Sequence, residues 1–163
     1  MAKRRLIAML IISILAAISA GCGNGSNNAV NANRPSSANR ANSAAKTNVE
    51  ELGVLINIPY ETDDIVWKED ETNKKLVAVF RLMPTDSARL VAEAEKSRPS
   101  QPATISTESW FPAELIAQSS MSGDDTLSGK SYAASSFLQE PYKNGSVTRI
   151  DNTDYFVLDV SAK

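Results

Sequence analysis

Cys22 is the only cysteine among the 163 residues of this chain. A lone cysteine cannot close a disulfide within the chain, so a folded part must be held together by its apolar core. Residues 49–163 have the length of one domain of ordinary size, and they contain no internal repeat. The sequence therefore predicts a single small domain that folds without disulfide bonds.

The start of the chain has the three parts of a secretory signal. Lys3, Arg4 and Arg5 form a basic beginning, an apolar run covers residues 6–20, and small residues precede Cys22. A permanent transmembrane helix is the alternative. Such a helix needs roughly 20 apolar residues, and this run is shorter and ends in small residues instead of aromatic or charged anchors. The pattern favours export.

The stretch Ile18-Ser19-Ala20-Gly21-Cys22 resembles the end of a bacterial lipoprotein signal peptide, and no charge lies between Leu6 and Cys22. Ser19 stands where the usual pattern prefers Leu. The resemblance implies removal of residues 1–21, a diacylglyceryl thioether on Cys22, and acylation of its new amino group by a chain such as palmitate. Two or more acyl chains anchor a protein stably, whereas one binds only marginally. A secreted protein with a free Cys22 is the alternative.

Residues 23–48 have the composition of a linker. Eight of these 26 positions are Asn, and Val30 is the only large aliphatic residue among them. Such a segment buries too little apolar surface to offset the entropy of ordering it, so we expect residues 22–48 to form a disordered tether. Gly23 follows the lipid site, where many Gram-negative lipoproteins retained in the inner membrane have Asp. That resemblance implies the outer membrane, if the cell has one.

The charge of the domain limits its partners. Residues 49–163 hold all 19 acidic residues and 11 of the 17 basic ones, so their net charge is −8. An acidic domain without a basic patch argues against nucleic-acid binding. Solubility is the simplest role of this charge. We expect the partners to be the membrane, through the lipid on Cys22, and an envelope protein.

The hydrophobic pattern of residues 49–163 predicts an α+β fold, with a mainly antiparallel sheet and one or two packed helices. The clearest elements are a hairpin over residues 65–68 and 75–82, a helix over 84–97, and a terminal hairpin over 147–150 and 155–160. Thr85 or Asp86 is expected to cap the helix.

Other segments give weaker signals. Residues 53–59 and 104–109 are predicted to be extended, and Pro112 is predicted to open a short helix. Residues 119–130 are predicted to form a loop, and Asn144-Gly145 a turn. We expect Trp67 to be half-buried.

The chain contains no histidine. This excludes Ser-His-Asp and Cys-His catalysis, and zinc sites built from Cys and His. Gly129-Lys130-Ser131 resembles the tail of a phosphate-binding P-loop, but the complete motif needs glycine at position 124, where this chain has Asp. We therefore expect neither an enzyme nor a cofactor. A hydrolase that uses carboxylates, Ser, Lys or Tyr is the least favoured alternative.

Two pairs of residues are candidate binding groups. Trp110 and Phe111 lie at a predicted strand-to-helix junction, where large aromatic side chains serve either a core or a protein interface. Asp124 and Asp125 lie in the predicted loop and would bind calcium weakly, although adjacent acids in a solvated loop are common. The leading hypothesis is a non-catalytic binding or assembly module of the cell envelope. The alternative is an envelope domain that binds a small ligand or calcium.

Overall fold

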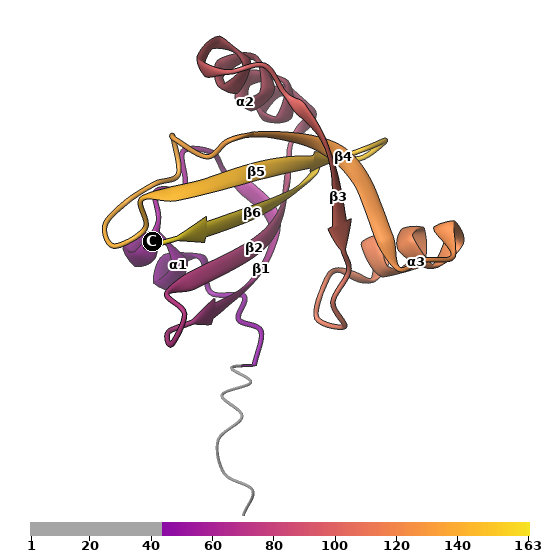
Figure 1. Cartoon of the computed structure of the whole chain (residues 1–163), viewed down its shortest axis with the longest axis horizontal. Coiled ribbons are helices and arrows are strands. Elements are labelled where there is room, and N and C mark those ends of the chain that lie inside the picture. Colours follow the sequence, from indigo (N-terminus) through magenta and orange to yellow (C-terminus); the bar gives the residue numbers. More distant parts are fainter. Residues whose placement is uncertain (1–43) are drawn as a thin grey trace, which may run out of the picture. The chain divides into compact units, whose positions relative to one another are not determined.

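The computed structural model describes residues 44–163, so Cys22, the signal segment and most of the tether lie outside the described residues. Three helices and six strands make up the described part (Figure 1). In chain order they are α1 (Val49–Leu55), β1 (Thr62–Asp70), β2 (Lys75–Leu82), α2 (Pro84–Ser97), β3 (Gln101–Ser106), α3 (Ala113–Ser122), β4 (Thr126–Ala133), β5 (Asn144–Ile150) and β6 (Tyr155–Ser161). None of these helices is both long and apolar enough to cross a membrane.

The six strands form one antiparallel sheet in the order β1-β2-β6-β5-β4-β3. Tight hairpins join β1 to β2 and β5 to β6, and the connection through α2 carries the chain from β2 to the opposite edge (Figure 1). As a result, β1 and β3 are the edge strands of the sheet. The predicted α+β class with a mainly antiparallel sheet is confirmed.

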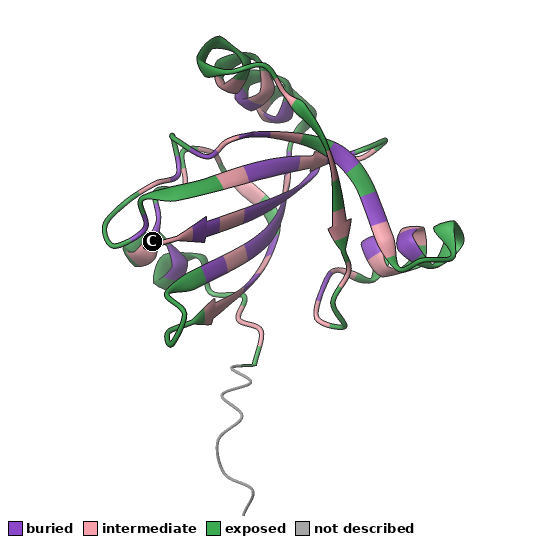
Figure 2. Cartoon of the chain, viewed as in Figure 1, coloured by how far each residue is buried: buried purple, intermediate pink, exposed green. Residues whose placement is uncertain are grey.

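One face of the sheet, the first face, packs against α1, α2 and the loop of residues 134–143, each of which contains buried residues (Figure 2). Alternate residues of a strand share a face, so Phe80 on β2 lies on the same side as Phe156 and Leu158 on β6. The Phe80 and Phe156 rings stack with their centroids 5.8 Å apart. These side chains form the larger of two apolar cores.

Trp67 is fully buried in this core, so the expectation of a half-buried ring was wrong. Its indole N–H donates to the backbone oxygen of Asn48 at 3.1 Å. The backbone of Lys46 pairs with that of Trp67, with both N–H to oxygen distances at 2.8 Å. Residues 44–48, which the composition assigns to the tether, therefore take part in the fold.

The opposite side, the second face, carries Val79 and Val157 together with Ile150. Leu115 on α3 and Phe111 in the preceding turn cover part of this face. The resulting core is smaller than the first, and it covers only one end of the sheet.

Several local predictions need correction. The α2 helix has the predicted bounds, but Met83 is its N-cap and no side chain caps it. The first three residues of the predicted extended segment 53–59 are instead the end of helix α1. This helix begins at Val49, because the Asn48 side chain accepts hydrogen bonds from the N–H groups of Glu50 and Glu51. The predicted loop 119–130 is instead the end of α3 and the start of β4.

Asn144-Gly145 begins strand β5 and does not form the predicted turn. A Cβ atom at Gly145 would lie 2.5 Å from the backbone oxygen of Asp159 on β6. Glycine is needed there because two strands approach closely. The local sequence cannot show whether a glycine serves such a close approach or a turn.

Candidate functional site

A cavity of about 340 Å³ lies on the second face and is called the groove below. It is lined by β2 and β3, although three other strands separate these two in the sheet. The sheet must therefore curve strongly, so that the edge strand β3 stands opposite the strands β2 and β6 across the groove. Sites of this size are typical of small ligands or of a few side chains of a partner.

The lining of the groove combines apolar and polar groups. Val77 and Val157 supply apolar surface from the sheet, and Phe111 supplies it from the turn before α3. Thr148, which is buried, also lines the groove from β5. At its margin the ammonium of Lys75 lies 2.9 Å from a carboxylate oxygen of Asp159. The groove can therefore hold apolar side chains while offering polar groups to a backbone.

Trp110 and Phe111 lie beside this groove in different environments. Phe111 is only 5% exposed and packs in the smaller core, whereas Trp110 is partly exposed. The two rings meet edge to face at 4.7 Å, and the Trp110 N–H donates to Glu108 at 2.7 Å. The Lys68 ammonium lies 5.6 Å from the centroid of the Trp110 ring, so the turn after β3 reaches over to β1. Their contact with a partner stays a prediction.

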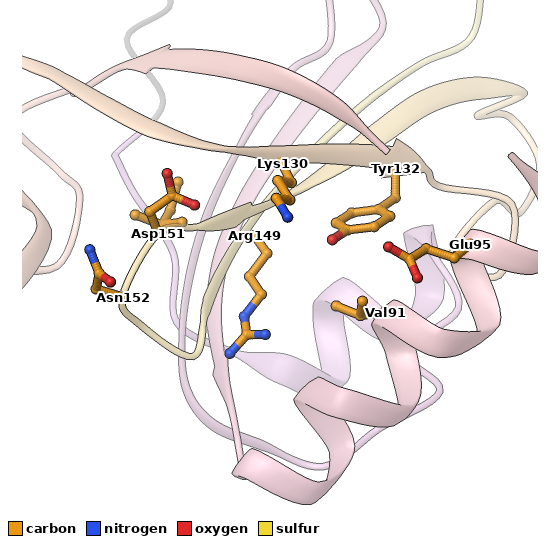
Figure 3. A pocket seen from close by; sticks show the side chains of 8 residues that line it. Val91, Glu95, Lys130, Tyr132, Arg149, Asp151 and Asn152 are labelled. Carbon is orange, nitrogen blue, oxygen red and sulfur yellow. The ribbon is translucent and has the colours of Figure 1, made fainter. Parts of the chain in front are cut away.

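A second cavity, of about 400 Å³, lies between α2 and the strands β4 and β5, and is called the α2 pocket. Figure 3 shows Lys130, Tyr132 and Arg149 projecting from the strands toward the helix that carries Val91 and Glu95. Lys130 and Arg149 are register partners on β4 and β5, and this pairing places both cations on one side of the pocket.

The charges of the α2 pocket are unevenly compensated. Arg149 donates through Nη2 to Asp154 at 3.0 Å and through Nε to the backbone oxygen of Thr153 at 3.3 Å. Burial raises the pKa of the Tyr132 hydroxyl, and the nearby negative charge of Glu95 acts in the same direction. Tyr132 is therefore a neutral hydrogen-bonding group at physiological pH.

A third cavity, of about 270 Å³, lies beside Arg81, Glu114 and Tyr155. The Arg81 guanidinium stands 3.3 Å from Asp63 and 3.6 Å from Glu114, and lies over the Tyr155 ring at 5.4 Å. Burial, together with a hydrogen bond to Glu114, raises the pKa of Tyr155 to about 12. These groups pair with one another and join β1, β2, β6 and α3, which is the arrangement of a structural network, although the buried Arg81 Nε has no hydrogen-bond partner among the described residues.

The predicted calcium pair lies in the turn between α3 and β4. The Asp124 oxygen Oδ1 accepts hydrogen bonds from the Ser122 hydroxyl at 2.8 Å and the Thr126 hydroxyl at 2.7 Å, and these bonds lower the pKa of Asp124. Over residues 44–163, no group of three or more His, Cys, Asp or Glu side chains is placed to hold a metal ion. Calcium binding at Asp124 and Asp125 stays a prediction.

The groups of the α2 pocket were missed as a site from the sequence. Glu95, Lys130 and Arg149 are far apart in the chain, and they meet only through the register of β4 with β5 and the packing of α2. Lys130 did attract notice, but as part of an incomplete phosphate-binding motif. No protein-family model, curated protein or solved structure matches this chain.

Proposed function

We propose that this chain is a membrane-anchored extracytoplasmic lipoprotein whose domain is a non-catalytic binding module of the cell envelope. The anchor is the lipid on Cys22, and the outer membrane is its place if the cell has one. The support for the anchor is the basic start, the apolar run and the small residues that end at Cys22. The tether of residues 22–48 would let the domain reach a partner away from the lipid surface.

The observation that carries the binding role is that the groove has an edge strand beside it. β3 pairs with β4 on one side and is the last strand of the described sheet on the other. Edge strands with free backbone groups accept an extended peptide as a further strand, and neighbouring pockets then select its side chains. The combination of a free edge and an adjacent cavity favours an extended segment of a partner protein.

The lining of the groove indicates what such a segment would contain. Apolar side chains would pack against Val77, Ile105 and Val157, while the Glu108 carboxylate lies at the turn that follows β3. The net charge of −8 over residues 49–163 would speed the approach of a basic partner. We therefore propose an envelope protein with an extended segment that carries both apolar and basic residues.

A photocrosslinking experiment in intact envelopes tests this proposal. A benzophenone amino acid would replace Thr104, which is exposed and lines the groove, or Val54, which is 72% exposed on α1. We expect a crosslink from position 104 and none from position 54, with the crosslinked peptide of the partner mapped by mass spectrometry to one apolar and basic segment. Equal crosslinking from both positions, or none from position 104, would contradict the proposed surface.

Filling the groove provides the second test. Ser146 lines the groove from β5, whereas Ser135 is exposed in the loop after β4. Ser146→Trp should abolish the crosslink from position 104, and Ser135→Trp should leave it unchanged. Circular dichroism and thermal melting of both variants would establish that each is folded. An undiminished crosslink in folded Ser146→Trp would show that the groove is not the binding surface.

A further inference from the structure

The α2 pocket carries opposite charges on its two sides, and two of them lack a protein partner. Glu95 lies on α2 and Lys130 lies on β4 (Figure 3). Throughout residues 44–163, neither side chain forms an ion pair or a hydrogen bond with another residue. The two groups line one cavity without meeting, so a bound molecule can lie between them.

The other lining groups add a balanced set of charges and donors. Arg149 and Asp151 contribute one further positive and one further negative group, so the charged residues of the pocket sum to zero within a strongly acidic domain. Val91 supplies apolar surface from α2. A neutral balance of separated charges matches a ligand that carries both signs itself.

We propose that the α2 pocket binds a small zwitterion with an ammonium group and a carboxylate, such as a free amino acid or a short peptide. Lys130 would bind the carboxylate, with Arg149 contributing N–H donors that its contacts to Asp154 and Thr153 leave over. Glu95 would bind the ammonium. The neutral hydroxyl of Tyr132 would supply a hydrogen bond between the two ends.

Each half of the ligand is needed for a physical reason. A simple anion would satisfy Lys130 but would cover Glu95 without giving that carboxylate a partner, and covering an unpaired charge is costly. A simple cation would satisfy Glu95 but would cover the Lys130 ammonium without giving it a partner. A zwitterion satisfies both sides at once, and charge-assisted hydrogen bonds are the strongest polar contacts available to it.

The test is a titration of the full chain, purified in detergent, monitored by the amide NMR signals of the protein. The probes are alanine, the dipeptide Ala-Ala, N-acetyl-Ala-Ala, which lacks the ammonium, and Ala-Ala amide, which lacks the carboxylate. We expect Ala-Ala, alanine or both to shift signals of residues 91–95, 130–132 and 149–152, and the comparison of the two distinguishes a peptide site from an amino-acid site. Each blocked dipeptide should bind about tenfold more weakly than Ala-Ala.

Two variants, each of which removes one charge, show which residue binds which end of the ligand. Glu95→Gln should weaken Ala-Ala about tenfold and remove its advantage over N-acetyl-Ala-Ala. Lys130→Met should weaken Ala-Ala similarly and remove its advantage over Ala-Ala amide. Lys96→Met changes an exposed lysine on α2, the helix that carries Glu95, and should have no effect on binding. Circular dichroism of each variant would establish that it is folded.

The proposal is overturned if neither alanine nor Ala-Ala shifts these signals at about 10 mM, a concentration that detects even millimolar binding. It is also overturned if the blocked dipeptides bind as tightly as Ala-Ala, because the charges would then be irrelevant. The proposal is likewise overturned if both folded variants bind Ala-Ala as tightly as the native chain does. The groove lies on the other face of the sheet, so these results leave the crosslinking test independent.

Discussion

The two faces of one sheet have different degrees of closure in this protein. The first face is closed by α1, α2 and the loop of residues 134–143 over Trp67 and Leu158, which are fully buried, and it stays open at the α2 pocket. The second face is covered by α3 and the turn of residues 107–112 at one end, and the groove lies beside this cover. The strands are shared, so the difference arises from what packs against each side.

This difference separates stability from binding. A closed region of a face contributes apolar burial, at about 25 cal/mol for each Å² removed from water, but offers no surface to a partner. A partly covered face contributes less burial and keeps a cavity open. We infer that the closed part of the first face holds the fold together, whereas the groove and the α2 pocket are available for contacts.

The largest expected effect contrasts neighbouring residues on β6 whose side chains lie on opposite faces. Leu158→Ala on the first face should lower the free energy of unfolding by about 3–4 kcal/mol, because it leaves a cavity in a closed core. Val157→Ala on the second face should cost about 1.5 kcal/mol, the value of two buried methylene groups. Urea denaturation of both variants measures the difference. Equal losses would show that the second face is as closed as the first.

The aromatic pair beside the groove provides a similar contrast within the second face. Phe111→Ala should cost about 3 kcal/mol, since the ring is 5% exposed. Trp110→Ala should cost about 1 kcal/mol, because its partly exposed ring forms fewer core contacts. Denaturation curves test both values. A larger loss of stability for Trp110→Ala than for Phe111→Ala would show that Trp110 is the core residue of the pair. With the expected values, Trp110→Ala is the suitable variant for testing partner binding, because it costs less stability.

One buried tyrosine on each face should make the folding stability of the protein fall at alkaline pH. Burial raises the pKa of both Tyr142 and Tyr155, the latter to about 12, and Tyr142 also donates to Glu69 at 2.7 Å. A tyrosine in the unfolded chain ionises near pH 10. The protonated hydroxyls therefore contribute their full stability below about pH 10, and this contribution is lost as pH rises toward 12.

Replacing either tyrosine tests this pH dependence. Tyr155→Phe should flatten the fall in stability between pH 10 and 12, since phenylalanine has no proton to lose. Tyr142→Phe should do the same, and should also cost about 1–2 kcal/mol at pH 7 through loss of the bond to Glu69. Urea denaturation across this pH range is the measurement. An unchanged slope in both variants would show that neither hydroxyl governs alkaline unfolding.

The smallest expected effect concerns the margin of the groove. Lys75→Met removes the exposed ion pair with Asp159, and such pairs contribute about 0.2–1 kcal/mol. The loss in unfolding free energy should be at most about 0.5 kcal/mol and should disappear in 1 M salt. A loss above about 1.5 kcal/mol would show that the open side of the groove is structural, which would weaken the contrast between the faces.

Much of the fold follows from local patterns. The bounds of α2 and the alternation of Phe156, Leu158 and Val160 on one face of β6 were predicted correctly, because side-chain periodicity depends only on neighbouring residues. The N-terminal helix α1 was missed. Its apolar residues resemble a short strand, and the capping by Asn48 begins inside a segment whose composition is that of a linker.

The proposed binding surfaces were not predictable in the same way. Trp110 and Phe111 were singled out together as candidate contacts, and only the structure separates the partial exposure of Trp110 from the burial of Phe111. Lys130 and Arg149 are 19 positions apart and become neighbours through the register of β4 with β5. Nothing in either local pattern specifies that register or the position of Glu95 opposite it.

The sequence by itself determined the fold class and excluded much chemistry. The absence of histidine and the lone Cys22 exclude whole groups of sites, since a missing residue type is missing in every fold. The tertiary structure decided which parts of each face closed and which charged groups line one pocket. Those outcomes depend on contacts between distant parts of the chain, which form only when helices and strands pack into one sheet and its covers.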